Sequence, residues 1–186
     1  GGDIRSSPSS VFIGMETILR NVYGSQEGDY QEITKSEEFT RVIQSFEKLF
    51  GKKVIPLGLE QGGQVAHKRG QKFRTFHTDM IVTPLSDTDV VVAELNSVLK
   101  SVPELDAIAG QLTSLGFNVT RIPYTEFNRG LRPVGQVTYN NVLLEKYRDV
   151  KRVYLPIYYR GRNSMAPEVF AGGMLQELNE KASAVY

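Results

Sequence analysis

The chain has 186 residues, of which 40% are hydrophobic and 23% are charged, and its formal net charge is +1. Such values are ordinary for a globular protein with a sizeable core, and the near-zero charge provides no bulk field that would favour nucleic acid or an anionic membrane. No cysteine is present, which excludes disulfides, thiolate metal sites and a cysteine nucleophile supplied by these residues. The same absence favours a reducing compartment such as the cytoplasm.

The first predicted module covers about residues 1–58 and consists of two strands, a helix and a closing strand. The helix is expected from about 36 to 50, because apolar residues recur there at three- and four-residue spacing. Thr34 and Glu37 have the spacing of a capping box, and Gly51 is a C-terminal stop signal. The strands are expected at 1–4, 11–14 and 53–57.

Two further modules, about 77–125 and 138–186, repeat this order along the chain. The second is expected to have strands at 77–82, 89–95 and 117–124 and a helix at about 104–115. The third is expected to have strands at 139–144 and 152–159 and a helix at about 167–182. Self-similarity at this period is typical of modular or propeller-like folds. No closing strand follows the third helix, so we expect a fragment of a longer protein; the alternative is a complete small domain with a frayed end.

A polar residue stands at the opening strand of each module: Asp3, Asp79 and Asn141. Equivalent positions in a closed array of modules point at one shared site. In a strand, His77 and Asp79 would project from the same face, where an imidazole and a carboxylate form a proton-transfer pair. A carboxylate can also take a guanidinium group through two hydrogen bonds. The plainer interpretation is a solvated histidine and aspartate at a strand edge.

Two glycine-bearing, basic stretches at 59–76 and 126–137 are expected to be loops between modules. The run from His67 to Lys72 could contact phosphate or RNA, although such a run is more often a solvated loop. His67, His77 and Asp79 could also be metal ligands, but no helical ligand pair supports that interpretation.

At this point the sequence resembles a known superfamily. Residues 1–4 with 11–14 look like the glycine-glycine-aspartate module of arginine deiminases and their relatives, and residues 77–79 look like their histidine-x-aspartate motif. Residues 139–142 followed by 153–156 resemble a segment of agmatine deiminases and microbial-type protein-arginine deiminases. These motifs occur in the family's order, and the resemblance extends over nearly the whole chain.

The resemblance implies the pentein fold, an α/β propeller of ββαβ modules, of which this chain would be one partial domain with about two and three-quarter of five blades. It also implies covalent catalysis on a guanidinium carbon, with no metal or organic cofactor. By motif match, His77 would be the general acid/base, Asp79 would hold two guanidinium N–H groups, and Asp3 and Asn141 would line the substrate site. The family's nucleophilic cysteine comes from a later blade, so this chain alone should be inactive.

The resemblance therefore implies a parent hydrolase acting on guanidino C–N bonds of arginine, agmatine, a methylated arginine or peptidyl arginine. An amidinotransferase of the same superfamily and a non-catalytic pentein used for binding are alternatives, as is an unrelated α/β binding domain that uses the basic loop. The expected partners are a guanidino substrate and either the rest of a longer chain or a second copy, with neither nucleic acid nor a membrane.

Overall fold

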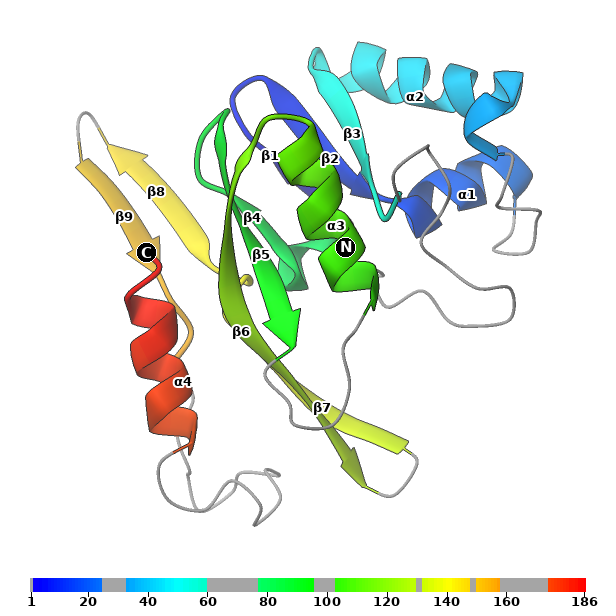
Figure 1. Ribbon diagram of the computed structural model, residues 1–186. Coiled ribbons are helices and arrows are strands. Elements are labelled where there is room, and N and C mark those ends of the chain that lie inside the picture. The colour runs from blue at the N-terminus through cyan, green and yellow to red at the C-terminus, as the bar shows by residue number, and fades with distance from the viewer. Residues whose placement is uncertain are drawn as a thin grey trace.

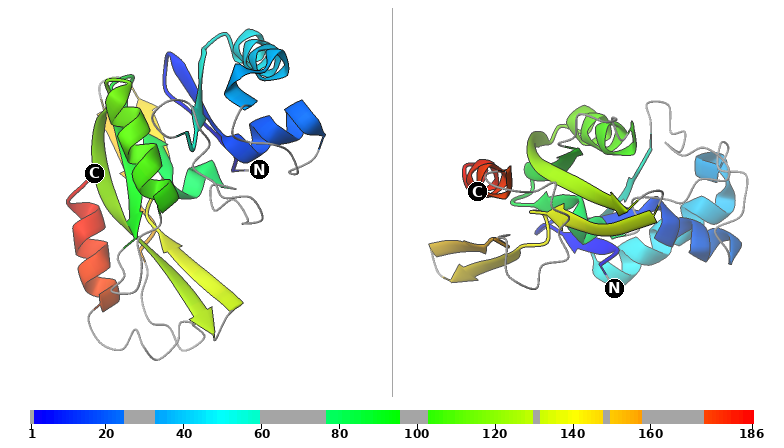
Figure 2. Two further views of the ribbon diagram at one scale, coloured as in Figure 1. Left: turned by 45° about the vertical axis from the view of Figure 1, so that its right-hand side comes forward. Right: turned by 90° about the horizontal axis from the view of Figure 1, so that it is seen from below.

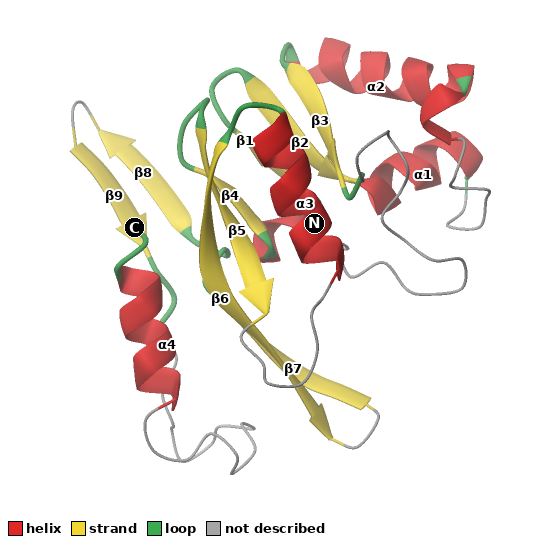
Figure 3. Ribbon diagram, viewed as in Figure 1, coloured by secondary structure: helices red, strands yellow, loops and turns green. Residues whose placement is uncertain are grey.

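Three separate sheets and the helices between them form this structure, a computed structural model (Figures 1 and 3). It describes residues 2–24, 33–59, 77–95, 103–129, 132–147, 150–157 and 174–186. Gly1, the basic run at 67–72 and residues 158–173 lie outside the described residues. None of the described helices is long and apolar enough to cross a membrane.

The first sheet has the order β1-β2-β3, with β1 (Ile4–Ser6) antiparallel to β2 (Ser10–Gly14) and β2 parallel to β3 (Lys53–Leu57). Parallel pairing requires a crossover connection, and helices supply it. One of them, α1 (Met15–Tyr23), begins directly after β2 and was not expected from the sequence. The next is a short 3-10 turn, η1 (Ile33–Lys35), followed by α2 (Glu37–Phe50).

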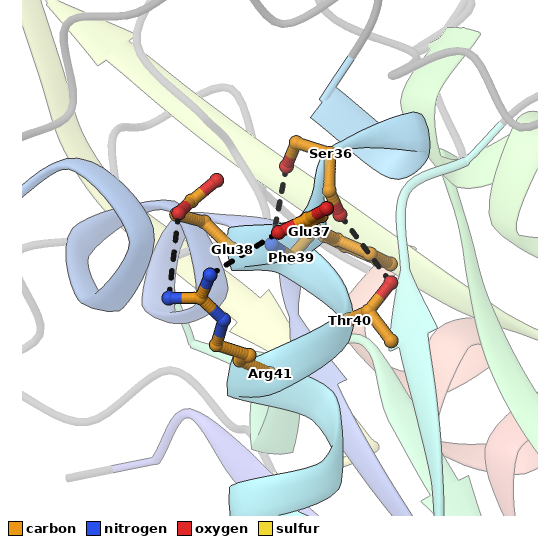
Figure 4. Close-up of polar contacts among 6 residues, drawn as sticks. All are labelled: Ser36, Glu37, Glu38, Phe39, Thr40 and Arg41. Carbon is orange, nitrogen blue, oxygen red and sulfur yellow. Dashed lines mark hydrogen bonds and ion pairs between the residues drawn. The ribbon is translucent and has the colours of Figure 1, made fainter.

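Helix α2 confirms the expected helix, but its cap differs from the prediction. Ser36 occupies the N-cap position and its hydroxyl accepts a hydrogen bond from the Phe39 backbone N–H at 3.1 Å (Figure 4). The predicted capping box placed Thr34 at this position, two residues too early, because η1 occupies 33–35. Arg41 reaches back to the Glu37 and Glu38 carboxylates at 3.2 and 3.6 Å. Gly51 ends the helix in the left-handed conformation with φ 63°, as expected.

The second sheet repeats the pattern of the first and extends it by one strand. Its order is β4-β5-β6-β7, with β4 antiparallel to β5, β5 parallel to β6 and β6 antiparallel to β7. Helix α3 (Pro103–Ser114) connects the two parallel strands. The strands are β4 (Val82–Pro84), β5 (Asp89–Leu95), β6 (Asn118–Arg129) and β7 (Arg132–Thr138).

Two expectations for these modules were wrong. The range 126–137 was expected to be a loop, but residues 126–129 and 132–137 belong to the antiparallel strands β6 and β7. The range 77–82 was expected to be a strand, but Thr78–Met80 form a 3-10 turn, η3, and the strand begins only at Val82. The turn is closed by the backbone N–H groups of Met80 and Ile81, which donate to the carbonyls of His77 and Thr78 at 3.0 and 3.1 Å.

The third module contains an antiparallel hairpin of β8 (Leu143–Tyr147) and β9 (Val150–Tyr154), and then α4 (Met174–Ser183). The hairpin and α4 lie at the opposite side of the molecule from α1 and α2 (Figures 1 and 2). In the described part of the chain, β9 pairs only with β8, whereas its counterparts β2 and β5 each pair with strands on both sides. Its apolar side chains are accordingly exposed, Val150 to 51% and Tyr154 to 50%.

The first and second sheets are each covered by helices of their own module and of the next one. One face of the first sheet packs against α1 and α2, and its other face, with Phe12 and Leu57, shares a core with β5 and α3. On the far face of the second sheet, Val91 and Ile122 share a core with Leu178 of α4. The apolar run of β5 is therefore buried on both faces, as such runs predict.

Polar contacts also join the first two modules at the hairpin ends. The Asp87 carboxylate, in the β4-β5 turn, accepts hydrogen bonds from the Ser7 and Ser9 hydroxyls at 2.7 and 2.6 Å and from the Ser9 backbone N–H at 2.8 Å. These hydrogen bonds lower the pKa of Asp87 below its ordinary value, and the one from the Ser9 hydroxyl has the largest effect. At its other end, β1 lies next to η3, and Asp3, His77 and Asp79 belong to or adjoin these two elements.

Candidate functional site

Asp79 lies directly against the beginning of the chain. Its backbone N–H donates to the Gly2 carbonyl at 2.8 Å, and a Cβ built on Gly2 would overlap the Asp79 carboxyl group. Gly2 is not among the glycines with positive φ, so the requirement for glycine here is steric rather than conformational. Two segments more than seventy residues apart in sequence thus meet at Gly2 and Asp79.

Asp3 is tied to the same turn through Thr78. The buried Thr78 hydroxyl donates to the Asp3 carbonyl at 2.9 Å, and the Gly14 N–H donates to the same carbonyl at 3.4 Å, which continues the β1-β2 ladder. The structure therefore places the backbone of Asp3 beside the turn that carries Asp79. The convergence of the two carboxylates on one shared site stays a prediction. Their roles toward a substrate stay predictions.

One oxygen of each carboxylate is buried without a partner. Oδ1 of Asp3 and Oδ1 of Asp79 are inaccessible to solvent and accept no hydrogen bond from any described residue. No described cation forms an ion pair with either group. A desolvated carboxylate oxygen without a donor is costly, and a cationic N–H donor relieves the cost. Each of these two carboxylate oxygens could therefore accept a further hydrogen bond.

Within the described residues, no group of three or more histidine, aspartate or glutamate side chains could hold a metal ion. His67, the third ligand considered from the sequence, lies outside the described residues.

His77 is exposed and precedes η3, where its carbonyl accepts the Met80 N–H. The expectation that His77 and Asp79 share one strand face was wrong, because Asp79 lies inside the 3-10 turn and not in a strand. The turn keeps the two residues within one short segment at the start of the second module. Whether the imidazole and the carboxylate act as a pair stays a prediction.

Asn141 joins the site indirectly, through Arg5. Its exposed side chain accepts a hydrogen bond from Arg5 Nη2 at 3.5 Å, and Arg5 lies two residues after Asp3 on β1. The preceding residue, Asn140, is instead buried. In the orientation that gives both amide atoms a partner, the Asn140 side-chain NH2 donates to Thr83 Oγ1 at 3.0 Å and to the Val91 carbonyl at 3.1 Å. The Asn140 side-chain oxygen then accepts from the Ala93 N–H at 3.2 Å. Asn140 thus holds the third module on the second sheet, and Asn141 faces outward.

The C-terminal residue, Tyr186, packs behind this region. Its hydroxyl donates to the Tyr139 carbonyl at 3.1 Å, and it also lies near Thr83 and Arg5. Burial raises the pKa of Tyr186 to about 12, against the smaller opposing effects of the Thr83 hydrogen bond and the Arg5 charge. The phenol is therefore neutral at physiological pH. The Thr138 hydroxyl donates to the Met80 carbonyl and so connects η3 to the end of β7.

Sequence reasoning missed three of the residues that build the site. Thr78 is the unspecified middle residue of the histidine-x-aspartate motif, although an isolated β-branched hydroxyl residue in a turn is often a backbone-bonding group. Gly2 belongs to the glycine-glycine-aspartate module, but nothing in the sequence identified Asp79 as the group that lies against it. Arg5 carried no signal, because a single arginine on a strand is ordinary.

Comparison with known proteins identifies the fold. No family model and no curated protein matches the sequence. Two solved structures from C. jejuni match over 77% of this chain: agmatine deiminase, with 17% identity and a TM-score of 0.53, and a Cys-to-Ser variant of agmatine deiminase with substrate bound, with 16% identity and a TM-score of 0.52. This chain covers 38% and 39% of those chains, respectively. The chain is therefore similar in its α/β fold to C. jejuni agmatine deiminase, and it spans less than two fifths of the length of that protein.

Proposed function

We propose that this chain supplies the guanidinium-binding and proton-transfer half of a hydrolase that cleaves guanidino C–N bonds. The observation that supports it is the meeting of Asp79 with Gly2 and Asp3, where two carboxylates each keep a buried oxygen without a donor. A guanidinium group is a planar cation with N–H donors in a fork that matches carboxylate oxygens. The shared fold with C. jejuni agmatine deiminase adds to this proposal.

In the proposed reaction, a cysteine thiolate from outside this chain forms a bond to the guanidinium carbon. The tetrahedral adduct expels an amine, which takes a proton from His77 as it leaves. A water molecule then gives a proton to His77 and adds to the thiouronium carbon. The second tetrahedral adduct expels the thiolate and loses its hydroxyl proton to solvent, which leaves a neutral ureido product. Asp3 and Asp79 hold the N–H groups of the cation through both steps and keep its carbon in place.

A second function, binding without catalysis, is favoured by one specific observation: none of the 186 residues is a cysteine. In that case the carboxylate pair would still bind a guanidinium group, and the exposed His77 would be dispensable. An amidinotransferase would use the same pair, with an amine in place of water as the second nucleophile. The three functions share the guanidinium site. They differ in whether a cysteine nucleophile is added to it and in whether water or an amine is the second nucleophile.

The site is tested by measuring agmatine binding to this chain with isothermal titration calorimetry. Asp79→Asn removes the negative charge but keeps the size, and we expect it to weaken binding by about 10- to 100-fold, since a hydrogen bond to a charged group contributes about 1.5–3 kcal/mol. Asp106→Asn is the matched control, because Asp106 is an exposed carboxylate on α3 that pairs with Arg121 at 3.0 Å, away from the site.

Equal agmatine affinity in wild type and Asp79→Asn would show that the carboxylate pair is not the guanidinium site. A loss of affinity in the Asp106→Asn control of the same size would attribute the effect to net charge alone. Turnover distinguishes enzyme from binder: in an assembly that contains a cysteine nucleophile, His77→Ala should abolish ammonia release while leaving agmatine affinity within about threefold, because proton transfer contributes to rate rather than to binding.

A further inference from the structure

Threonine hydroxyls tie the residues on both sides of Asp79 to two different strands. Thr78, which precedes Asp79, is fully buried, and its hydroxyl donates to the Asp3 carbonyl at 2.9 Å. Met80, which follows Asp79, has a carbonyl that accepts a hydrogen bond from the buried Thr138 hydroxyl at the end of β7. Neither threonine takes part in the proposed reaction. Both hydroxyls nevertheless act on the turn that carries the proposed cation-binding carboxylate.

This turn is too short to fix its own orientation. η3 has three residues and is closed by two backbone hydrogen bonds, from the Met80 N–H at 3.0 Å and the Ile81 N–H at 3.1 Å. Short 3-10 segments have poor hydrogen-bond geometry, and a single turn recovers little of the entropy lost in ordering it. Successive side chains in a 3-10 helix are about 120° apart, because it has three residues per turn. Fixing Thr78 against β1 therefore also fixes the direction of the Asp79 side chain.

The two hydroxyls are suited to this task. The Asp3 carbonyl accepts a second hydrogen bond from the end of β2, but at 3.4 Å, so the bond from Thr78 is the stronger one. The Thr138 hydroxyl donates to Met80 and accepts from the Asn140 backbone N–H at 3.2 Å, and hydrogen bonds in such a chain strengthen one another. Threonine is branched at Cβ, which restricts χ1 and keeps the hydroxyl in one direction.

We infer that Thr78 and Thr138 are positioning residues that orient the Asp79 carboxylate for a guanidinium group. Thr78 holds the turn against β1, and Thr138 holds it against β7. The inference rests on the proposed function, because it takes Asp79 as a guanidinium-binding group. It adds that the affinity for the cation depends on two buried hydroxyls that belong to different parts of the chain and do not touch the cation.

The experiment measures the affinity of this chain for agmatine by isothermal titration calorimetry. Thr78→Val replaces the hydroxyl by a methyl group of similar size, and we expect about 3- to 10-fold weaker binding, the range for one lost hydrogen bond. Thr78→Ser keeps the hydroxyl and should restore the wild-type affinity. In an Asp79→Asn background, Thr78→Val should have no further effect on binding, because Thr78 acts through Asp79.

Ser7→Ala is the matched control. The buried Ser7 hydroxyl also ties the first module to the second, since it donates to the Asp87 carboxylate at 2.7 Å. Ser7 follows β1, whereas Asp3 and the turn lie at the other end of that strand. Both Ser7→Ala and Thr78→Val should lower the free energy of unfolding in urea, but only Thr78→Val should weaken agmatine binding. Equal weakening by Ser7→Ala would show that Thr78 has a merely structural role and would overturn the inference.

A second variant, Thr138→Val, covers the case in which Thr78→Val does not fold. It removes the hydroxyl bond on the other side of Asp79 and should also weaken agmatine binding by about 3- to 10-fold, with rescue by Thr138→Ser. Wild-type agmatine affinity in the valine variants, with binding still dependent on Asp79, would overturn the inference but leave the proposed function standing. If wild type does not bind agmatine, the proposed function fails and the inference fails with it.

Discussion

Gly2→Ala is the substitution that most directly tests how the site is built. A Cβ at Gly2 would overlap the Asp79 carboxyl group, and the nearest atoms it meets are all from that group. Because the φ of Gly2 is not positive, alanine can adopt the backbone conformation, and Asp79 must rotate instead. A side chain forced about 30° from its rotamer costs about 0.5–1.5 kcal/mol. Replacing glycine stabilises by about 0.4–1 kcal/mol through the unfolded state.

These two effects nearly cancel, so the free energy of unfolding should change by less than about 1 kcal/mol. Binding should change far more, because a displaced carboxylate loses charge-assisted hydrogen bonds that contribute about 1.5–3 kcal/mol, or about 10- to 100-fold in agmatine affinity. Urea unfolding and calorimetric titration measure the two quantities on the same sample. Gly2→Ala in an Asp79→Asn background should have no further effect on binding, since the two residues act as a unit.

Gly110→Ala is the matched control, because Gly110 lies in α3 with nothing within 4 Å of a built Cβ. It should stabilise the protein by up to about 1 kcal/mol and leave agmatine affinity unchanged. If Gly2→Ala binds agmatine within twofold of wild type, the steric argument for Gly2 is wrong. If Gly2→Ala instead unfolds the protein, the displacement is not confined to Asp79.

Three further predictions concern stability and titration. Phe12→Ala should lower the free energy of unfolding, measured in urea, by about 3–5 kcal/mol, because Phe12 is fully buried between the first two modules. Leu49→Ala, at a side chain that is 72% exposed, should change the free energy of unfolding little. Similar losses in the two variants would contradict the shared core. Asp87 has a lowered pKa, so its contribution to the free energy of unfolding is present above its unfolded pKa near 3.8 and is lost as pH falls through the lower folded value. Asp87→Asn should therefore flatten the dependence of the free energy of unfolding on pH over that range. An unchanged dependence would contradict the serine contacts. Because the pKa of Tyr186 is raised from 10 to about 12, the contribution of this group to stability is present below pH 10 and is lost as pH rises toward 12. An ultraviolet titration of wild type should show a tyrosine that ionises near pH 12, and this transition should be missing in Tyr186→Phe. Identical titrations of the two proteins would refute the burial of Tyr186.

Local sequence patterns were sufficient where an element depends on its own residues. Helix α2 follows from an apolar stripe at helical spacing, and Gly51 ends it as expected because only the left-handed conformation closes the last turn without strain. The four consecutive apolar residues of β5 predicted a strand buried on both faces, and α3 and α4 cover those two faces. The order of the motifs also predicted the fold, because the repeat and the family resemblance are both properties of the linear sequence.

Only the tertiary structure decided the geometry of the candidate site. The segment 77–80 is a 3-10 turn rather than a strand because Thr78 and Asp79 donate hydrogen bonds to the carbonyls of Asp3 and Gly2, partners more than seventy residues away. No local pattern contains those partners, and the same holds for the assignment of Asn140 to the interior and Asn141 to the surface. Secondary structure that is stabilised by its neighbours along the chain is readable from sequence, whereas a site assembled from hydrogen bonds between modules exists only once those modules pack.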